Sequence, residues 1–109
     1  MGYANATCPI EIPLLYLDAQ VNAGAGMGFK LNGQTKLFIG SITSTSGYDI
    51  RLQIFDSLDL GTFNLIGRYD AGQSNILIDI SNLSEFRIVV SGYNGDGYSK
   101  VYVNNIKIY

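Results

Sequence analysis

The sequence contains no histidine, no tryptophan and one cysteine, Cys8, among its 109 residues. The lack of histidine removes the usual catalytic base, the commonest metal ligand and any Ser-His or Cys-His nucleophile pair. A single cysteine excludes an intrachain disulfide. We interpret Cys8 as a small apolar residue near the amino terminus, with pairing to a cysteine elsewhere in a longer parent chain as the alternative. We therefore expect no enzyme.

Charge is also scarce. Charged residues make up 15% of the chain and the net charge is −2, whereas soluble domains average about 25% charged residues. The seven lysines and arginines are scattered, but nucleic-acid binding needs them clustered, so we expect no nucleic-acid partner. A surface made polar by Asn, Ser and Thr favours an extracellular or virion-associated setting.

Long apolar runs are missing too. The longest, Ile12 to Leu17 and Ile88 to Val90, fall well short of the roughly 20 residues that a membrane helix needs. We therefore expect no membrane insertion. We also expect no cofactor, because the chain has no histidine and no glycine loop that fits a phosphate. After Met1-Gly2 we expect no signal peptide, and this start also fits a domain taken from a longer protein.

What remains is a series of short strand-like segments separated by turn residues. The clearest is Tyr48 to Phe55, in which Ile50, Leu52 and Ile54 alternate with polar residues, as in a half-buried antiparallel strand. The expected strands span 14–21, 27–31, 35–42, 48–55, 63–69, 76–80, 86–90 and 98–109. The pattern predicts a single all-β domain over 1–109, a two-sheet antiparallel β-sandwich of jelly-roll type, with 1–12 as an extended N-terminal arm.

Two local features sharpen this prediction. Asn32-Gly33 is a strong hairpin signal and predicts that strands 27–31 and 35–42 pair with each other. In the last strand, the apolar pattern changes phase at Asn104-Asn105, which predicts a β-bulge there.

The closing stretch, Ser91 to Ile108, runs from a strand through the loop Asn94-Gly95-Asp96-Gly97 into a strand that reads aromatic, apolar, Asn, Asn, apolar. It resembles the end of galactose-binding-like jelly-roll domains, such as carbohydrate-binding modules and discoidin-like domains, and Tyr48 to Tyr69 resembles their central hairpin. The resemblance implies a non-catalytic ligand-binding module, often part of a larger protein. Several such modules hold a structural calcium ion with an acidic residue in the last strand. The matching residue here is the neutral Asn104, so calcium is possible but not favoured.

Two carboxylate patterns have competing interpretations. Asp56 and Asp59 either shape a turn through side-chain to backbone bonds or form a catalytic pair, and the turn is favoured. The Asn94 to Gly97 loop is either a hairpin turn or a cation site, and the turn is again favoured.

Tyrosine is the most informative residue type, with eight copies. Its ring offers an apolar face and its hydroxyl a hydrogen bond, which suits sugars, although tyrosines are also ordinary strand residues. We expect the ligand to contact the loop bracketed by two tyrosines, at Tyr93, Asn94, Asp96 and Tyr98. The next place is the outward side of strand 48–55, at Arg51 and Gln53.

Two functions fit these features. The first is a non-catalytic carbohydrate-binding module, for a glycan or polysaccharide, appended to a larger protein. The second is a structural or assembly domain of a virion, phage tail or surface appendage, whose partners are other domains of a longer parent chain or further copies in a homo-oligomer. The position of the tyrosines distinguishes the two functions: a compact groove or a cluster at the loop end favours the first, and a broad, flat, apolar patch on a sheet face favours the second.

Overall fold

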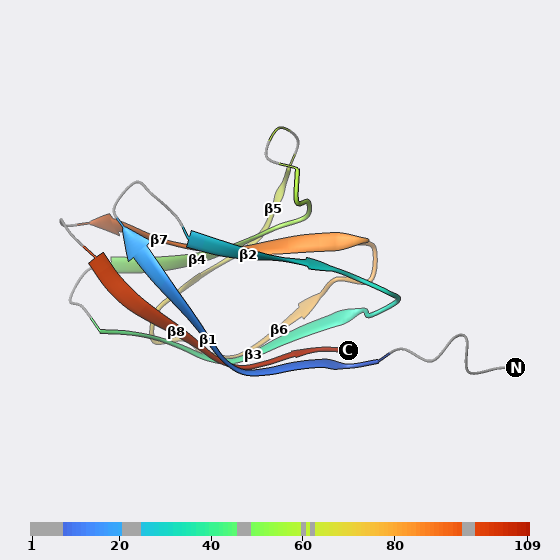
Figure 1. Ribbon diagram of the computed structural model, residues 1–109, viewed down its shortest axis with the longest axis horizontal. Helices are drawn as coiled ribbons and strands as arrows, with labels where there is room; N and C mark the ends of the chain where they lie inside the picture. The colour runs from blue at the N-terminus through green and yellow to red at the C-terminus, as the bar shows by residue number, and fades with distance from the viewer. Residues whose placement is uncertain (1–7, 21–24, 46–48, 60, 62, 95–97) are drawn as a thin grey trace, which may run out of the picture.

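All eight predicted strands are present in the computed structural model, which describes residues 8–20, 25–45, 49–59, 61, 63–94 and 98–109 (Figure 1). The strands are β1 (Ile10–Gln20), β2 (Ala25–Lys30), β3 (Lys36–Ser44), β4 (Asp49–Phe55), β5 (Leu65–Asp70), β6 (Ser74–Asp79), β7 (Glu85–Asn94) and β8 (Tyr98–Ile108). None of the described residues belongs to a helix, so this part of the chain offers no helical segment that could cross a membrane.

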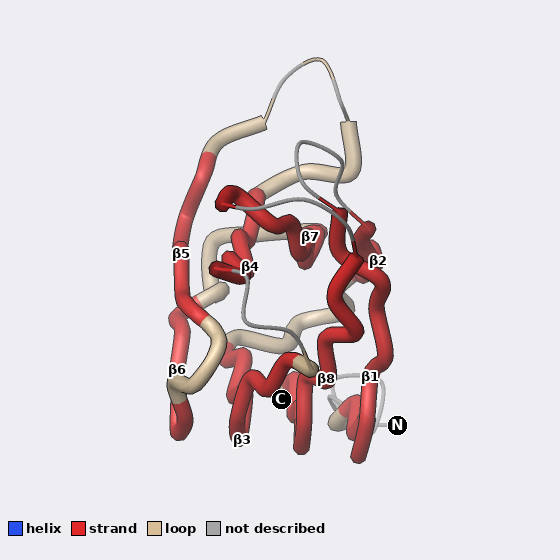
Figure 2. The backbone as a smooth tube through the Cα atoms, turned by 90° about the vertical axis from the view of Figure 1, so that its left-hand side faces the viewer, coloured by secondary structure: helices blue, strands red, loops and turns tan. Residues whose placement is uncertain are grey.

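The strands form two antiparallel sheets of four, in the orders β1-β8-β3-β6 and β2-β7-β4-β5. Figure 2 looks along the strands and shows the two sheets as separate layers. The first strand pairs with the eighth, the second with the seventh, the third with the sixth and the fourth with the fifth. This is a long antiparallel hairpin folded over on itself, which confirms the jelly-roll type.

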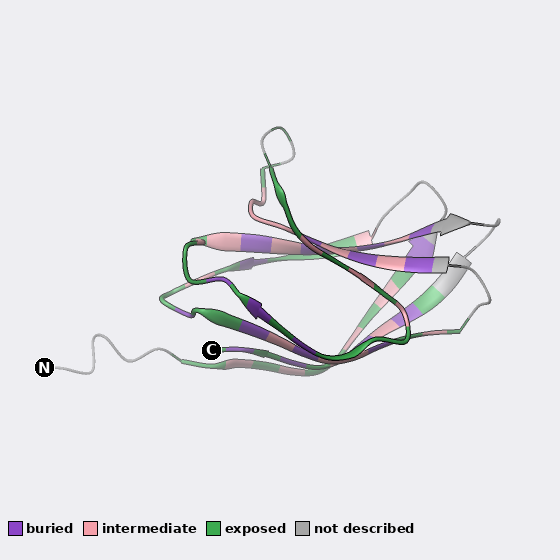
Figure 3. Cartoon of the chain, turned by 180° about the vertical axis from the view of Figure 1, so that it is seen from behind, coloured by how far each residue is buried: buried purple, intermediate pink, exposed green. Residues whose placement is uncertain are grey.

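The core lies between the sheets and is built from strand residues of alternate positions, as Figure 3 shows by the alternating buried bands. In β4 the inward residues are Ile50, Leu52 and Ile54, all buried as predicted. The rings of Phe29 and Phe86 stack in this core with centroids 5.0 Å apart. β-Branched and aromatic residues suit these positions because they pack well on a pleated surface.

The hairpin predicted at Asn32-Gly33 is wrong. The segment connects β2 to β3, but these strands lie in different sheets: β2 pairs with β7, and β3 pairs with β6 and β8. A local turn signal indicates that the chain reverses direction. Which strands pair is decided by burial of the apolar faces of the two sheets against each other.

The first strand begins earlier than expected. Ile10 and Ile12 pair with Ile108 and Ile106, so residues 10–12 belong to the sheet rather than to an N-terminal arm. Pro13 is tolerated within β1 because this strand lies at the edge of the sheet.

The inward residues of β8 do change phase at Asn104-Asn105, but no β-bulge causes the change. Val103 and Ile106 are both buried although they are three positions apart. The register of β1 against β8 is the same on both sides of this point, so neither strand contains an inserted residue. The bulge prediction is wrong because the neighbouring strands change phase at the same place.

This shared phase change follows one row of residues across the sheet, which we call the crease: Pro13, Asn105, Gly40 and Asn75. Asn105 and Asn75 each have a φ of +54°, a left-handed conformation that asparagine adopts more readily than most residues. A Cβ atom at Gly40 would lie 2.8 Å from Asn105 Cβ and 2.9 Å from the Asn104 carbonyl oxygen. Beyond the crease, β1 and β8 turn toward the other sheet (Figure 1).

Candidate ligand-binding face

The outward side of the β1-β8-β3-β6 sheet, which we call the open face, carries an aromatic and charged row just before the crease. The register places Glu11 of β1 beside Lys107 of β8, Lys107 beside Phe38 of β3, and Phe38 beside Leu77 of β6. Strand alternation points these side chains outward because their neighbours Ile39, Ile106 and Ile108 are buried.

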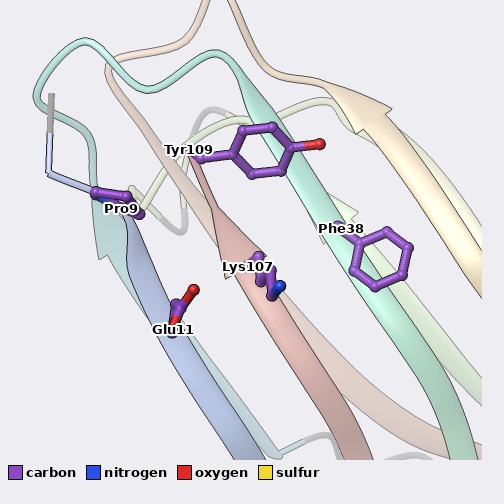
Figure 4. A pocket seen from close by; sticks show the side chains of 5 residues that line it. All are labelled: Pro9, Glu11, Phe38, Lys107 and Tyr109. Carbon is purple, nitrogen blue, oxygen red and sulfur yellow. The ribbon is translucent and has the colours of Figure 1, made fainter.

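Part of this row forms a hollow of about 460 Å³, which we call the aromatic pocket. It is lined by Pro9, Glu11, Phe38, Lys107 and Tyr109. Figure 4 shows Lys107 between Glu11 and Phe38, with the Tyr109 ring close by at the end of β8. Its volume lies within the range of about 300–1,000 Å³ that is usual for small-molecule sites.

Two opposite charges, those of Glu11 and Lys107, line the aromatic pocket. Glu11 and Lys107 are exposed, and within the described residues neither side chain has an ion pair or a hydrogen bond. The carboxylate can accept hydrogen bonds and the ammonium can donate three. Both groups are therefore available to a ligand that offers donors and acceptors together.

A second aromatic group lies on the open face beyond the crease. Tyr16 and Tyr102 are register partners whose ring centroids are 5.5 Å apart, at an interplanar angle of 53°; we call them the tyrosine pair. The Tyr16 hydroxyl donates a 2.6 Å hydrogen bond to Asp18, which raises the pKa of Tyr16 to about 12. Beside the pair, the Asn104 amide donates to the Ser41 hydroxyl at 3.0 Å.

A further hollow of about 510 Å³ lies at the β3-β6 side of the sheet and is lined by Thr35, Lys36, Leu77, Ile78, Asp79 and Ser81. Its carboxylate is already engaged. Hydrogen bonds from Ser81, including one of 2.8 Å from its backbone N–H, hold the pKa of Asp79 below its ordinary value, with the charge of Lys36 adding to the effect. This hollow therefore offers a ligand less than the aromatic pocket does.

The outward side of the β2-β7-β4-β5 sheet differs, because the described residues between β4 and β5 lie over it. We call these residues, 56–59, 61, 63 and 64, the strap, and this side the strapped face. The Leu58 backbone N–H and the Ser57 hydroxyl both donate to the Glu85 carboxylate, at 2.7 and 3.2 Å. The Leu58 side chain packs over Gly28, where a Cβ atom would collide with it.

Aromatic rings and charge on the strapped face contact one another. The Arg87 guanidinium carbon lies 5.2 Å from the ring centroids of both Phe55 and Phe63, within the range of cation–π contact. The two rings meet edge to face, with centroids 4.8 Å apart. Arg51 and Gln53, the alternative site predicted from sequence, are half-buried in the same sheet.

The loop predicted to bind the ligand lies at the opposite end of β8 from the aromatic pocket. Tyr93 and Asn94 end β7, and Tyr98 begins β8. Asp96 lies outside the described residues, as do the side chains of the other three. The loop site therefore stays a prediction.

Asp56 and Asp59, the two carboxylates of the strap considered in the sequence analysis, shape turns, as predicted. Asp56 accepts hydrogen bonds from the Asn64 backbone N–H and side-chain amide, at 2.7 and 3.1 Å, and these lower the pKa of Asp56. Asp59 accepts a 2.8 Å hydrogen bond from the Gly61 N–H. Among the described residues, no three His, Cys, Asp or Glu side chains lie close enough together to hold a metal ion.

No family model matches this chain, and no curated protein matches it. Among solved structures, it is similar to the Yersinia pseudotuberculosis-derived mitogen, with a TM-score of 0.60 and 13% identity over 94% of this chain and 88% of that one. It is also similar to the Drosophila NLP core (TM-score 0.42, 12% identity, 88% of this chain and 98% of that one). A third match, from infectious bursal disease virus Gt strain, has a TM-score of 0.43 and 15% identity, over 94% of this chain and 33% of that one.

At such identity, the likeness to the mitogen shows a shared β-sandwich fold and nothing about function. The resemblance of the closing strands to galactose-binding-like domains stays a prediction.

Proposed function

We propose that this chain is a non-catalytic carbohydrate-binding module that binds a glycan in the aromatic pocket of the open face. The observation that carries the proposal is the combination of two aromatic rings, Phe38 and Tyr109, with two charges that have no partner among the described residues, Glu11 and Lys107, around one hollow. The poorly charged, Asn- and Ser-rich surface fits an extracellular or virion-associated setting.

The chemistry of this pocket suits a sugar. Sugar rings present C–H faces that stack on aromatic side chains, and hydroxyls that donate and accept hydrogen bonds. Glu11 accepts from hydroxyls and Lys107 donates to them, and hydrogen bonds to ionised groups are about twice as strong as neutral ones. Of the described pocket residues only Glu11 is a carboxylate, whereas glycoside hydrolysis ordinarily uses two.

The test is a glycan array of plant, bacterial and host glycans, followed by titration calorimetry on the best glycan. We expect Phe38→Ala and Lys107→Ala to weaken binding about 10-fold or more each, in line with about 1–3 kcal/mol for a central contact residue. Leu65→Ala is the matched control, because it removes a 49% exposed apolar side chain from the other sheet and should leave binding unchanged. Thermal melts establish that each variant folds.

Two outcomes contradict the proposal. One is the absence of binding across all three classes of glycan. The other is binding that survives Phe38→Ala and Lys107→Ala but is lost in Tyr93→Ala or Tyr98→Ala, which places the ligand in the loop predicted from sequence.

The assembly function is a second candidate because Leu77, which is 58% exposed, adjoins Phe38 on the open face. Exposed apolar surface marks protein contacts when it is contiguous. Light scattering distinguishes the two functions. An oligomer that Leu77→Glu dissociates supports assembly, and a strict monomer at high concentration contradicts it.

A further inference from the structure

The tyrosine pair and the aromatic pocket lie on the same side of the same two strands. Tyr16 and Glu11 both come from β1, and Tyr102 and Lys107 both come from β8. Tyr16 is 43% exposed, and its hydrogen bond to Asp18 fixes the orientation of its ring. The open face therefore carries two separate aromatic platforms, one on each side of the crease.

The surface between the two platforms is partly hollowed. A smaller hollow of about 90 Å³ shares Glu11 and Lys107 with the aromatic pocket and extends to Pro13 and Asn105 in the crease. Beyond the crease, two register pairs separate this hollow from the tyrosine pair: Leu14 and Asn104 face outward, whereas Leu15 and Val103 face the core.

Polar groups accompany the rings along this path. The Asn104 amide lies 3.0 Å from the Ser41 hydroxyl and 3.4 Å from the Thr43 hydroxyl. These groups stand beside the tyrosine pair, because Thr43 is the register partner of Tyr102. The Asn104 amide nitrogen is engaged in these bonds, but the Ser41 hydroxyl can still donate its proton and the Asn104 amide oxygen can still accept, so both can bind sugar hydroxyls next to an aromatic ring.

We propose that the aromatic pocket and the tyrosine pair are two subsites of one track, which binds an internal stretch of a linear polysaccharide rather than a single terminal sugar. This inference rests on the proposed carbohydrate-binding function. Lys107 and Tyr102 are five residues apart on β8, or roughly 16 Å at about 3.3 Å per residue. That span exceeds one sugar ring, so a ligand that contacts both subsites has to be a chain of several units.

The test is a chain-length series measured by titration calorimetry, with one to six sugar units cut from β-1,4-glucan, chitin and galactan. For the series that binds, we expect affinity to rise with length until the oligosaccharide reaches both subsites. Tyr102→Ala should then weaken binding of the six-unit ligand about 10-fold and leave the shortest bound ligand unaffected. Phe38→Ala should weaken binding at every length, and Tyr102→Phe, which keeps the ring, should bind like the parent.

The possible results distinguish a failure of the track from a failure of the proposed carbohydrate-binding function. If Phe38→Ala weakens binding but Tyr102→Ala has no effect at any length, the track is wrong and the carbohydrate-binding function stands. Affinity that stops rising at one or two units also overturns the track. If none of the three series binds and the glycan array is blank, the proposed function itself is wrong, and the track with it.

Discussion

The two outer faces of the sandwich use similar side chains in opposite ways. On the strapped face, Arg87 lies against two phenylalanine rings, and Glu85 accepts two hydrogen bonds from the strap. On the open face, Lys107 lies between Glu11 and Phe38, and neither charge has such a partner among the described residues. Aromatic rings next to charges therefore do not by themselves mark a binding surface. They are available to a ligand only where other residues of the chain do not already contact them.

The largest difference in mutational effect between the two faces should come from Glu85, which accepts two hydrogen bonds from the strap. We expect Glu85→Ala to lower the free energy of unfolding by about 1.5–3 kcal/mol, because Leu58 and Ser57 lose hydrogen bonds to an ionised acceptor. Urea denaturation measures this loss. Glycan affinity should not change, since Glu85 is on the face opposite the aromatic pocket. Weaker glycan binding without a loss of stability would indicate that the strapped face, rather than the open face, binds the ligand.

The next effect concerns the crease that shapes the open face. A methyl group at position 40 would meet the Asn104 carbonyl oxygen and Asn105 Cβ, so we expect Gly40→Ala to destabilise the fold by about 1–3 kcal/mol through overpacking. Gly61→Ala is the control, because its nearest neighbour would lie at an ordinary 3.4 Å. Equal thermal stability of the two variants would mean that the crease does not require glycine.

A smaller effect is expected from the left-handed residue in the same row. Asn105 has a φ of +54°, which costs most L-residues about 1–2 kcal/mol. We expect Asn105→Val to lose stability of that order, because its side chain is branched at Cβ, and Asn105→Gly to remain close to the parent. Chemical denaturation of both variants checks this, and a valine variant as stable as the glycine variant would contradict the backbone assignment.

The smallest effect is a titration on the open face. Tyr16 has a pKa of about 12, raised above 10.0 chiefly by its hydrogen bond to Asp18. Because the folded pKa exceeds the unfolded one, this bond stabilises the fold below about pH 10, and its contribution is lost as the pH rises through about 12. We expect Asp18→Asn to lower the pKa of Tyr16, measured by tyrosinate absorbance. An unchanged tyrosinate titration would show that Asp18 does not hydrogen-bond to the Tyr16 hydroxyl.

The strands could be predicted from sequence because their signal is local. Alternation of Ile50, Leu52 and Ile54 is visible within a few residues, and these side chains are indeed buried. The pairing of β2 could not be predicted from the neighbouring Asn32-Gly33 turn, because its partner is β7, more than 50 residues further along the chain.

The aromatic pocket could not be predicted for the same reason. Glu11, Phe38 and Lys107 are far apart in sequence and meet only because β8 lies between β1 and β3. Alternation with Ile106 and Ile108 points only Lys107 outward, because Phe38 lies in the apolar run 37–39 and Glu11 lies in the expected N-terminal arm. The sequence predicts the loop from Tyr93 to Tyr98 as the site instead, because its polar and aromatic residues are adjacent in sequence.

Mapping the bound glycan by amide chemical shifts in ¹⁵N-labelled protein tests most directly whether the open face is the binding surface. With the best glycan from the array, we expect the largest shift changes at Glu11, Phe38 and Lys107 and none at Leu58 or Glu85 on the strapped face. Changes confined to the loop from Tyr93 to Tyr98, or to the strapped face, would contradict the assignment of the ligand to the open face.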